Sequence, residues 1–525
     1  MRGVDGARAK PDAAIALRAA RTAAGWAVSA AVLPAACLAA TLTLIAGTGC
    51  ERQGTPDTAR TGAVDSTSAT AEVISRGRAG LHAVVPSVAL VGEPVKLTVA
   101  PLTDLGTPDL KWRGTLEIES TDSALVSFGP FAAHQGSFAR DIVFRTPGFQ
   151  RVTVRSDHGE TTIAGPVFVA RTEEELRVRA GEPARRLYWG DAHGHTDLGD
   201  GTNPPATYLA YARDVARLDF TCVSEHDLQQ YLDVGFDTVP SGWDSVRTVA
   251  EEYRRPGFAV LLGWEWSSRE WGHRVVLFPG DEPRYVSFRH APTPAALARE
   301  LAGTGAVSVL AHPTGSRLTP PVVWEGYVPG FDRAIEIYSG HGSNDESDFR
   351  ETSDPDPARS ALESIRRGLP LGIVAFSDTH LSTPGNPWPP EIRDAPWPGG
   401  LTAVWAEQPT EASILDAIAN GRCYATSGPR FYVEATLDDR TFGETLELRA
   451  GTSARLRATV AAPGILREVQ VRLGDEVYRK FAGGGPQMEI ELTVGPFDES
   501  TAVWLTGRSD DDERLWTTPI RVLVP

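Results

Sequence analysis

The chain of 525 residues has a formal net charge of −17 and 41% hydrophobic residues. Because single hydrophobic cores stop growing near about 250–300 residues, we expect two or three domains. The 51 Gly and 39 Pro follow no period and charged residues make up only 23% of the chain, which excludes collagen, a coiled coil and wholesale disorder. The acidic balance offers nucleic acid no general electrostatic attraction, so no nucleic-acid partner is expected.

The amino end has the pattern of an export signal. Cationic residues predominate over residues 1–21, and residues 22–50 carry no charge, so we expect residues 1–50 to be a signal peptide. The ending Leu44-Ile-Ala-Gly-Thr-Gly-Cys50 resembles a bacterial lipoprotein signal. That resemblance implies lipidation of Cys50 and a place in the cell envelope or periplasm, with membrane contact only through this anchor. An uncleaved membrane-spanning anchor and secretion are the alternatives.

The composition changes after the signal. Residues 51–79 are rich in Ser, Thr, Gly and charge without an apolar period, which is typical of a flexible linker. Short runs of period two occupy residues 80–180, as in Val95-Lys-Leu-Thr-Val99, and return in residues 431–525, as in Glu468-Val-Gln-Val-Arg472. Such alternation, bounded by Gly or Pro, predicts a small β-sandwich in each segment.

Between these segments, in residues 185–430, short apolar strands alternate with amphipathic helical stretches. We expect helices over 204–218, 294–302, 357–367 and 411–419, three of which have proline near the start. Alternation of strands and helices predicts an α/β fold with a parallel sheet. At this length a (β/α) barrel is the economical form.

Metal-binding residue types follow the expected strands of this segment. Seven of the 11 His lie at or just past strand ends. The residues concerned are His193, His195 and Asp200; His226 and Asp227; Glu265 and His273; His312; His341; and Asp378 and His380. Strand ends share one face of a barrel, so these side chains are expected to converge on one pocket. The alternate positions of His193 and His195 suit a shared ion, and a carboxylate such as Glu265 can bridge two ions.

These motifs resemble the PHP (polymerase and histidinol phosphatase) superfamily of metal-dependent phosphoesterases, in a branch with flanking β-domains. The resemblance implies a distorted (β/α)7 barrel that holds two or three divalent ions, of Mn, Fe or Zn, and hydrolyses a small-molecule phosphoester. It also implies a ligand set, which comprises His193, His195, Asp200, His226, Glu265, His312, His341, Asp378 and His380.

Several assignments stay open at this stage. Asp197 or Asp227 could take the place of Asp200, Glu336 is a rival of His341, and His273 could replace or supplement either. Asp227 and His273 are the candidates for protonating the leaving group. Arg422 and Arg430, in the segment that resembles the closing stretch of PHP proteins, are candidates for holding a phosphate.

Two other functions remain alternatives. A metal-activated water does not dictate the electrophile, so an amidohydrolase-like enzyme that cleaves a C–N or C–O bond fits the same ligands. Arg or Lys side chains close to the ions would distinguish the phosphoesterase. The third hypothesis is a non-catalytic lipoprotein that binds another component of the envelope, and the full set of ligands argues against it.

Overall fold

The computed structural model describes residues 80–103, 106–125, 131–134, 137–180, 185–230, 232–239, 241–280, 283–316, 319–345, 355–385 and 399–525. The predicted signal peptide, the predicted linker and Cys50 lie outside these ranges. Within them, no helix is both long and apolar enough to cross a membrane.

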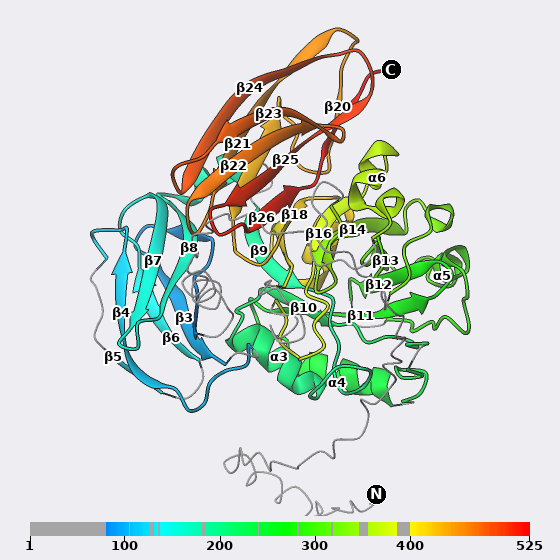
Figure 1. Cartoon of the computed structure of the whole chain (residues 1–525), viewed down its shortest axis with the longest axis horizontal. Helices are drawn as coiled ribbons and strands as arrows, with labels where there is room; N and C mark the ends of the chain where they lie inside the picture. The colour runs from blue at the N-terminus through cyan, green and yellow to red at the C-terminus, as the bar shows by residue number, and fades with distance from the viewer. Residues whose placement is uncertain are drawn as a thin grey trace, which may run out of the picture. The chain divides into compact units, whose positions relative to one another are not determined.

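Two sheets form the first part of the described chain (Figure 1). One sheet has the order β1 (Gly80–Val84), β3 (Pro94–Leu102), β6 (Phe138–Val143). The other has the order β2 (Val88–Leu90), β8 (Thr161–Ala170), β7 (Gly148–Ser156), β4 (Arg113–Ser120), β5 (Phe131–His134). Side chains of alternate residues, such as Val99, Ile118, Ile142 and Val154, bury one face of each sheet in a shared core. Helix α2 (Glu173–Ala180) follows β8 and precedes the central strands.

The central strands form a mixed sheet. They are β9 (Arg186–Asp191), β10 (Phe220–Val223), β11 (Ala259–Ser268), β12 (Gly272–Phe278), β13 (Val307–Leu310), β14 (Asp332–Ser339), β15 (Gly342–Ser343), β16 (Gly372–Ala375), β17 (Leu401–Ala406) and β18 (Cys423–Thr426). Strands β9, β10 and β11 are parallel, as are β13, β14 and β16. Strand β12 is antiparallel to both β11 and β13, and β17 is antiparallel to β9. The sheet is therefore not uniformly parallel, because a hairpin joins β11 to β12 without a helix. Closure into a (β/α)7 barrel remains a prediction.

Helices connect several of the central strands. They are α3 (Pro205–Asp214), α4 (Gly242–Tyr253), α5 (Pro294–Glu300), α6 (Ala361–Arg366) and α7 (Glu411–Ala419), with single 3₁₀ turns η1 (Trp324–Gly326) and η2 (Pro357–Arg359). The hydroxyls of Thr293, Ser360 and Thr410 cap the starts of α5, α6 and α7 by accepting backbone N–H groups. Each of the four expected helical stretches contains a helix, whereas α4 was not expected.

Most of the strands after β18 extend the central sheet, and three form a separate sheet. Strands β19 (Tyr432–Leu437), β21 (Thr452–Ala461) and β24 (Gln487–Phe497) form a sheet of their own. The others are β20 (Thr445–Glu447), β22 (Leu466–Leu473), β23 (Glu476–Ala482), β25 (Thr501–Ser509), β26 (Arg514–Thr517) and β27 (Ile520–Leu523). They join the central sheet where β26 pairs with β18. Hydrogen bonding therefore crosses the boundary predicted at residue 430.

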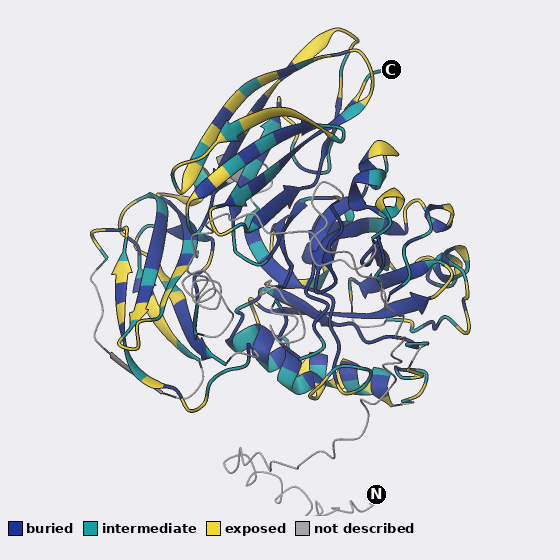
Figure 2. Ribbon diagram, viewed as in Figure 1, coloured by how far each residue is buried: buried dark blue, intermediate teal, exposed yellow. Residues whose placement is uncertain are grey.

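The strand ends of the central sheet position the functional side chains. Figure 2 shows the central strands almost entirely buried, whereas the exposed residues lie on loops, on the first and last groups of strands and on the helices. Just beyond the strands, isolated bridges pair Gly194 with Thr379 and His226 with Glu265. The carboxyl ends of β9, β10, β11 and β16 are thereby brought together.

Candidate metal centre

Ten side chains gather at this end of the central sheet. Overlapping groups of their nitrogen and oxygen atoms, each within 4.8 Å of one another, could hold metal ions. The members are His193, His195, Asp200, His226, Glu265, His273, His312, His341, Asp378 and His380. The nine residues that the resemblance implied as ligands all belong to these groups, together with His273, and their role as ligands stays a prediction.

Four buried atoms at the middle of this cluster face one another. The Nε2 atom of His193 lies 3.4 Å from Glu265 Oε2 and 3.6 Å from Asp378 Oδ1. The Nε2 atom of His195 lies 3.5 Å and 3.1 Å from the same two oxygens. None of the four atoms makes a hydrogen bond of good geometry among the described residues, and Glu265 Oε2 also lies 2.8 Å from His226 Nδ1. Buried polar atoms are normally paired, so these atoms fit metal ligands, in two groups that share His193: one with Glu265 and His312, the other with His195 and Asp378.

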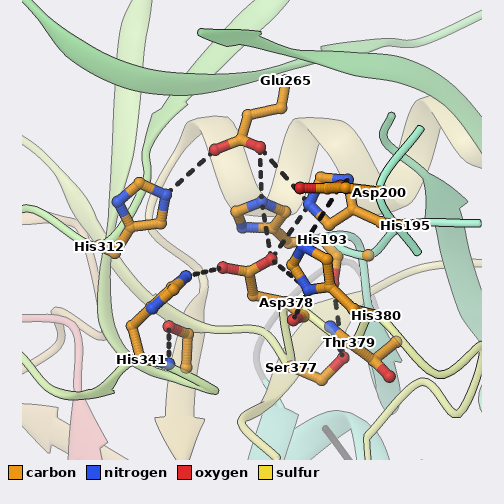
Figure 3. Close-up of polar contacts among 12 residues, drawn as sticks. His193, His195, Asp200, Glu265, His312, His341, Ser377, Asp378, Thr379 and His380 are labelled. Atoms are coloured by element: carbon orange, nitrogen blue, oxygen red, sulfur yellow. Dashed lines mark hydrogen bonds and ion pairs between the residues drawn. The ribbon is translucent and has the colours of Figure 1, made fainter. Parts of the chain in front are cut away.

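The two carboxylates link the middle of the cluster to a second group of histidines. The other oxygen of Glu265, Oε1, lies 3.1 Å from His312 Nε2 and 2.8 Å from His273 Nδ1. The other oxygen of Asp378, Oδ2, lies 2.9 Å from His341 Nε2. Figure 3 shows His312 and His341 on one side of these carboxylates. Each carboxylate is thus placed to bridge two ions.

A third group lies on the opposite flank, around Asp200 (Figure 3). Its Oδ2 atom lies 3.5 Å from His226 Nε2, and its Oδ1 atom lies 3.4 Å from His380 Nε2. The His195 ring stacks on the His226 ring with centroids 4.4 Å apart. This flank offers a separate set of nitrogen and oxygen atoms for an ion.

The charged side chains of the cluster shift one another's pKa values. Burial lowers the pKa of the His193 imidazole, but Asp378, Glu336 and Glu265 outweigh it and hold the pKa well above its ordinary value. Burial raises the pKa of Asp378, but the nearby histidines outweigh it and hold the pKa well below its usual range. For His273 burial dominates and lowers the pKa to about 4. The centre therefore combines ionised carboxylates with histidine nitrogens, which suits exchange of protons for divalent cations.

Backbone geometry around the ligands is constrained. His312 and Asp378 have φ angles of 30° and 52°, a left-handed region that residues other than glycine rarely adopt. The buried Asp191 carboxylate accepts N–H groups from His193, at 3.2 Å, and from Ser377, at 3.0 Å. Such over-determined strain is typical of functional sites.

The structure gives Asp227 a different environment from the one predicted for a proton donor. Its Oδ1 atom accepts the backbone N–H groups of Leu228, at 2.7 Å, and Ser267, at 2.9 Å, and its Oδ2 atom accepts that of Phe288. Burial raises its pKa to about 7. Because both carboxylate oxygens already accept hydrogen bonds from backbone N–H groups, these contacts favour a structural role for Asp227. The open rival Asp197 is exposed and belongs to none of the ligand groups.

The structure does not bring the two predicted phosphate-binding arginines to the cluster. The guanidinium of Arg430 donates to the backbone oxygens of Ala216 and Arg217 and lies over the Trp189 ring. Arg422 pairs with Asp416 of α7, next to the end of β17 that pairs with the amino end of β9. The ligands follow the carboxyl end of β9, so Arg422 lies toward the opposite end of the sheet. A loop arginine carries no sequence signal of what it faces, which is why both were mispositioned.

Two glutamates contact the histidines from behind: Glu336, which the sequence offered as a rival ligand to His341, and Glu225, to which the sequence gave no role. Glu336 contacts His193 Nδ1 at 2.7 Å, whereas it belongs to none of the ligand groups. Glu225 Oε2 is buried 3.8 Å from His195 Nδ1. The sequence signal for Glu336 was its alternation with Ile335 and Ile337 on a buried strand. The only signal for Glu225 was its place in the motif Ser-Glu-His.

Comparisons with known proteins give distant matches. The model of DUF3604, a family of proteins of unknown function, matches residues 368–444. An uncharacterised protein of Chlamydia pneumoniae is 23% identical over 422 residues, which cover 73% of this chain and 63% of that protein. A Chlamydia trachomatis protein is 22% identical over 412 residues, covering 72% and 63% of the two chains. This chain therefore spans less than two thirds of the length of these relatives.

Among solved structures, one similar chain is a two-domain protein from Bacteroides vulgatus, described as containing a predicted PHP-like metal-dependent phosphoesterase. It is 16% identical, with a TM-score of 0.35, and the match covers 64% of this chain and 96% of that chain.

Proposed function

We propose that the protein is an exported metal-dependent hydrolase, with a phosphoester as its substrate. The observation that carries the proposal is the set of four buried atoms of His193, His195, Glu265 and Asp378, which face one another without a hydrogen bond of good geometry among the described residues. Ligand groups on both flanks of this set provide for two or three ions, of Mn, Fe or Zn.

Divalent ions held there would supply Lewis acidity, lower the pKa of water and orient a phosphoester oxygen. The chain's own residues supply the geometry. Glu265 and Asp378 each present their two oxygens to different histidines, so they fix the spacing between the ion positions. The ions would also offset the negative charge of a phosphoester, so that an acidic chain could bind an anionic substrate.

His273 is the residue best placed to move a proton. Its Nδ1 atom lies 2.8 Å from Glu265 Oε1, so the ring's proton is directed at that carboxylate and the Nε2 atom keeps its lone pair. The pKa of about 4 keeps the ring neutral at physiological pH. We propose that this lone pair accepts a proton from the attacking water, a different role from the protonation of the leaving group that the sequence suggested.

One observation supports the alternative function, an amidohydrolase-like enzyme. Among the described residues, no arginine or lysine forms an ion pair with Asp200, Glu265 or Asp378, and neither Arg422 nor Arg430 reaches the cluster. An enzyme that cleaves an uncharged C–N or C–O bond needs no such cation.

Elemental analysis of the purified chain, combined with hydrolysis of phosphomonoester, phosphodiester and amide reporters with Mn, Fe or Zn, tests the proposal. We expect two or three ions per chain and phosphoester turnover that the His193→Ala substitution abolishes. The exposed His290, which pairs with Glu300 at 3.8 Å, provides the control substitution His290→Ala, which should retain ions and turnover. Ions with amide turnover alone would favour the alternative. A chain that binds no ion and turns over no reporter would contradict both hydrolases and leave the binding lipoprotein.

A further inference from the structure

A buried carboxylate, Glu336, connects two ligands that come from distant parts of the chain. It lies on β14, between β13 and β16, and its side chain is fully buried. The Oε1 atom lies 2.7 Å from His193 Nδ1, and the Oε2 atom accepts the backbone N–H of His312 at 2.8 Å. One side chain thus contacts residues that are 143 and 24 positions away.

The contact with His193 determines which nitrogen of the imidazole ring carries the proton and which keeps a lone pair for a metal ion. A carboxylate can only accept, so Nδ1 must carry the proton, and the lone pair then lies on Nε2. Nε2 is the atom that faces Glu265 Oε2 and Asp378 Oδ1 and lacks a partner among the described residues. A carboxylate behind a histidine both fixes the ring orientation and raises the basicity of the ligating nitrogen.

The contact with His312 holds a strained backbone. His312 has a φ of 30°, in the left-handed region that costs a residue with a Cβ free energy. The bond from its N–H to Glu336 favours this conformation, in which the ring reaches Glu265 Oε1 at 3.1 Å. Without that bond the local backbone would relax toward ordinary angles and withdraw the ring.

We propose that Glu336 is a positioning residue that pre-organises His193 and His312, through its two oxygens, for metal binding. The inference rests on the proposed metal centre and deepens it. Glu336 is not itself a ligand. Its role is to set the affinity of the ions held between His193, Glu265 and His312.

The substitution Glu336→Gln tests this role with little change of volume. An amide has one acceptor oxygen and one donor nitrogen, so it can serve His193 or His312 but must point a donor at the other's donor. Measured by chelator competition with Co²⁺, Mn²⁺ and Zn²⁺, the dissociation constant of the affected ion should rise about 10- to 100-fold. The visible absorption spectrum of the Co²⁺-loaded chain should also change, because the ligand geometry changes.

Asp332→Asn is the matched control. Asp332 is also a buried carboxylate of β14, but it lies at the other end of the strand, where it pairs with Arg274 Nε at 3.2 Å and accepts the N–H of Val328 at 2.8 Å. This substitution should lower the unfolding midpoint of the metal-free chain while leaving the Co²⁺ spectrum and affinity unchanged. A merely structural Glu336 would behave in the same way.

The outcomes separate the inference from the proposed function. A wild-type chain that binds no ion contradicts the metal centre itself. A wild-type chain that binds ions, and a Glu336→Gln chain with the same affinity and spectrum, overturn the positioning role alone. Should Glu336→Gln fail to fold, Glu336→Asp carries the test. Its carboxylate is one methylene shorter and cannot reach both partners, so wild-type affinity and spectrum in that variant would equally overturn the proposal.

Discussion

His273 stands apart from the other histidines of the centre. It lies at the start of β12, opposite Ser267 of β11, rather than beyond the end of a parallel strand. We expect His273→Ala to lower kcat by about 10²- to 10⁴-fold, the usual contribution of general acid–base catalysis. The number of bound ions should stay the same, because the facing atoms of His193, His195, Glu265 and Asp378 are untouched. Steady-state kinetics combined with elemental analysis of the same sample checks both statements.

The ion count decides between two roles of His273. It also belongs to a possible ligand group with His226 and Glu265. Loss of an ion together with activity would make His273 a ligand and remove it as the proton acceptor. His290→Ala, which alters an exposed histidine, should leave kinetics and ion content as in the wild type.

At this scale the sequence predicted which side chains would gather, but not which residues hold them in place. His193, His195, His226 and Asp378 follow apolar runs directly, so the position of a strand end in the sequence gives their position in space. The alternation Ile335-Glu336-Ile337 marked Glu336 as buried, but no local pattern encodes its contact with His193, 143 positions away, or the contact of Glu225 with His195. The same holds for Arg430, whose partners in the segment after α3 only the fold reveals.

The β11–β12 hairpin is the element that most affects the centre, since it carries Glu265 and His273 on adjacent strands. Its turn ends at Gly272, with a φ of 76°, where a Cβ atom would lie 2.7 Å from Val322 Cα and 2.8 Å from Pro321 O. Gly272→Ala should therefore combine a left-handed conformation with a backbone clash. We expect a loss of unfolding free energy of about 2–4 kcal/mol, measured by denaturant titration.

Gly257 separates these two effects. Its φ is 86°, also left-handed, but a Cβ atom there would have no neighbour within 4 Å. Gly257→Ala should cost only the conformational part, about 1–2 kcal/mol. Equal losses for the two substitutions would show that the hairpin tolerates the clash by shifting.

The sequence did not reveal this hairpin for a physical reason. All residues of β12 are buried, so the strand lacks the alternation that marks a half-buried strand. The parallel strands β10 and β13 were expected because apolar runs precede metal-binding residues, whereas β12 begins with such a residue and then becomes apolar. Its antiparallel direction is therefore visible only in the structure.

For the whole molecule, one buried arginine joins the first and last β-regions. Arg151, on β7, donates from Nε and Nη2 to the backbone oxygen of Ala462, at 2.9 and 2.7 Å. It also donates to the oxygens of Pro463, at 3.1 Å, and Pro486, at 2.7 Å. Residues 311 to 335 positions apart are thus held together by one guanidinium.

Arg151→Met should uncouple the unfolding of these regions. Methionine retains the apolar part of the side chain but cannot donate hydrogen bonds, so several buried carbonyl groups lose their partners. We expect the free energy of unfolding to fall by about 3 kcal/mol. Cooperative unfolding requires such contacts, so calorimetry should show a transition of residues 80–180 that moves to lower temperature and separates from the rest. Arg155→Met, on the same strand, removes only an exposed ion pair with Glu119, at 3.3 Å, and should change stability by less than about 0.5 kcal/mol. A single unshifted transition in Arg151→Met would mean that the apolar contacts between these regions suffice to hold them together. The β-regions would then brace the metal centre through packing rather than through this arginine.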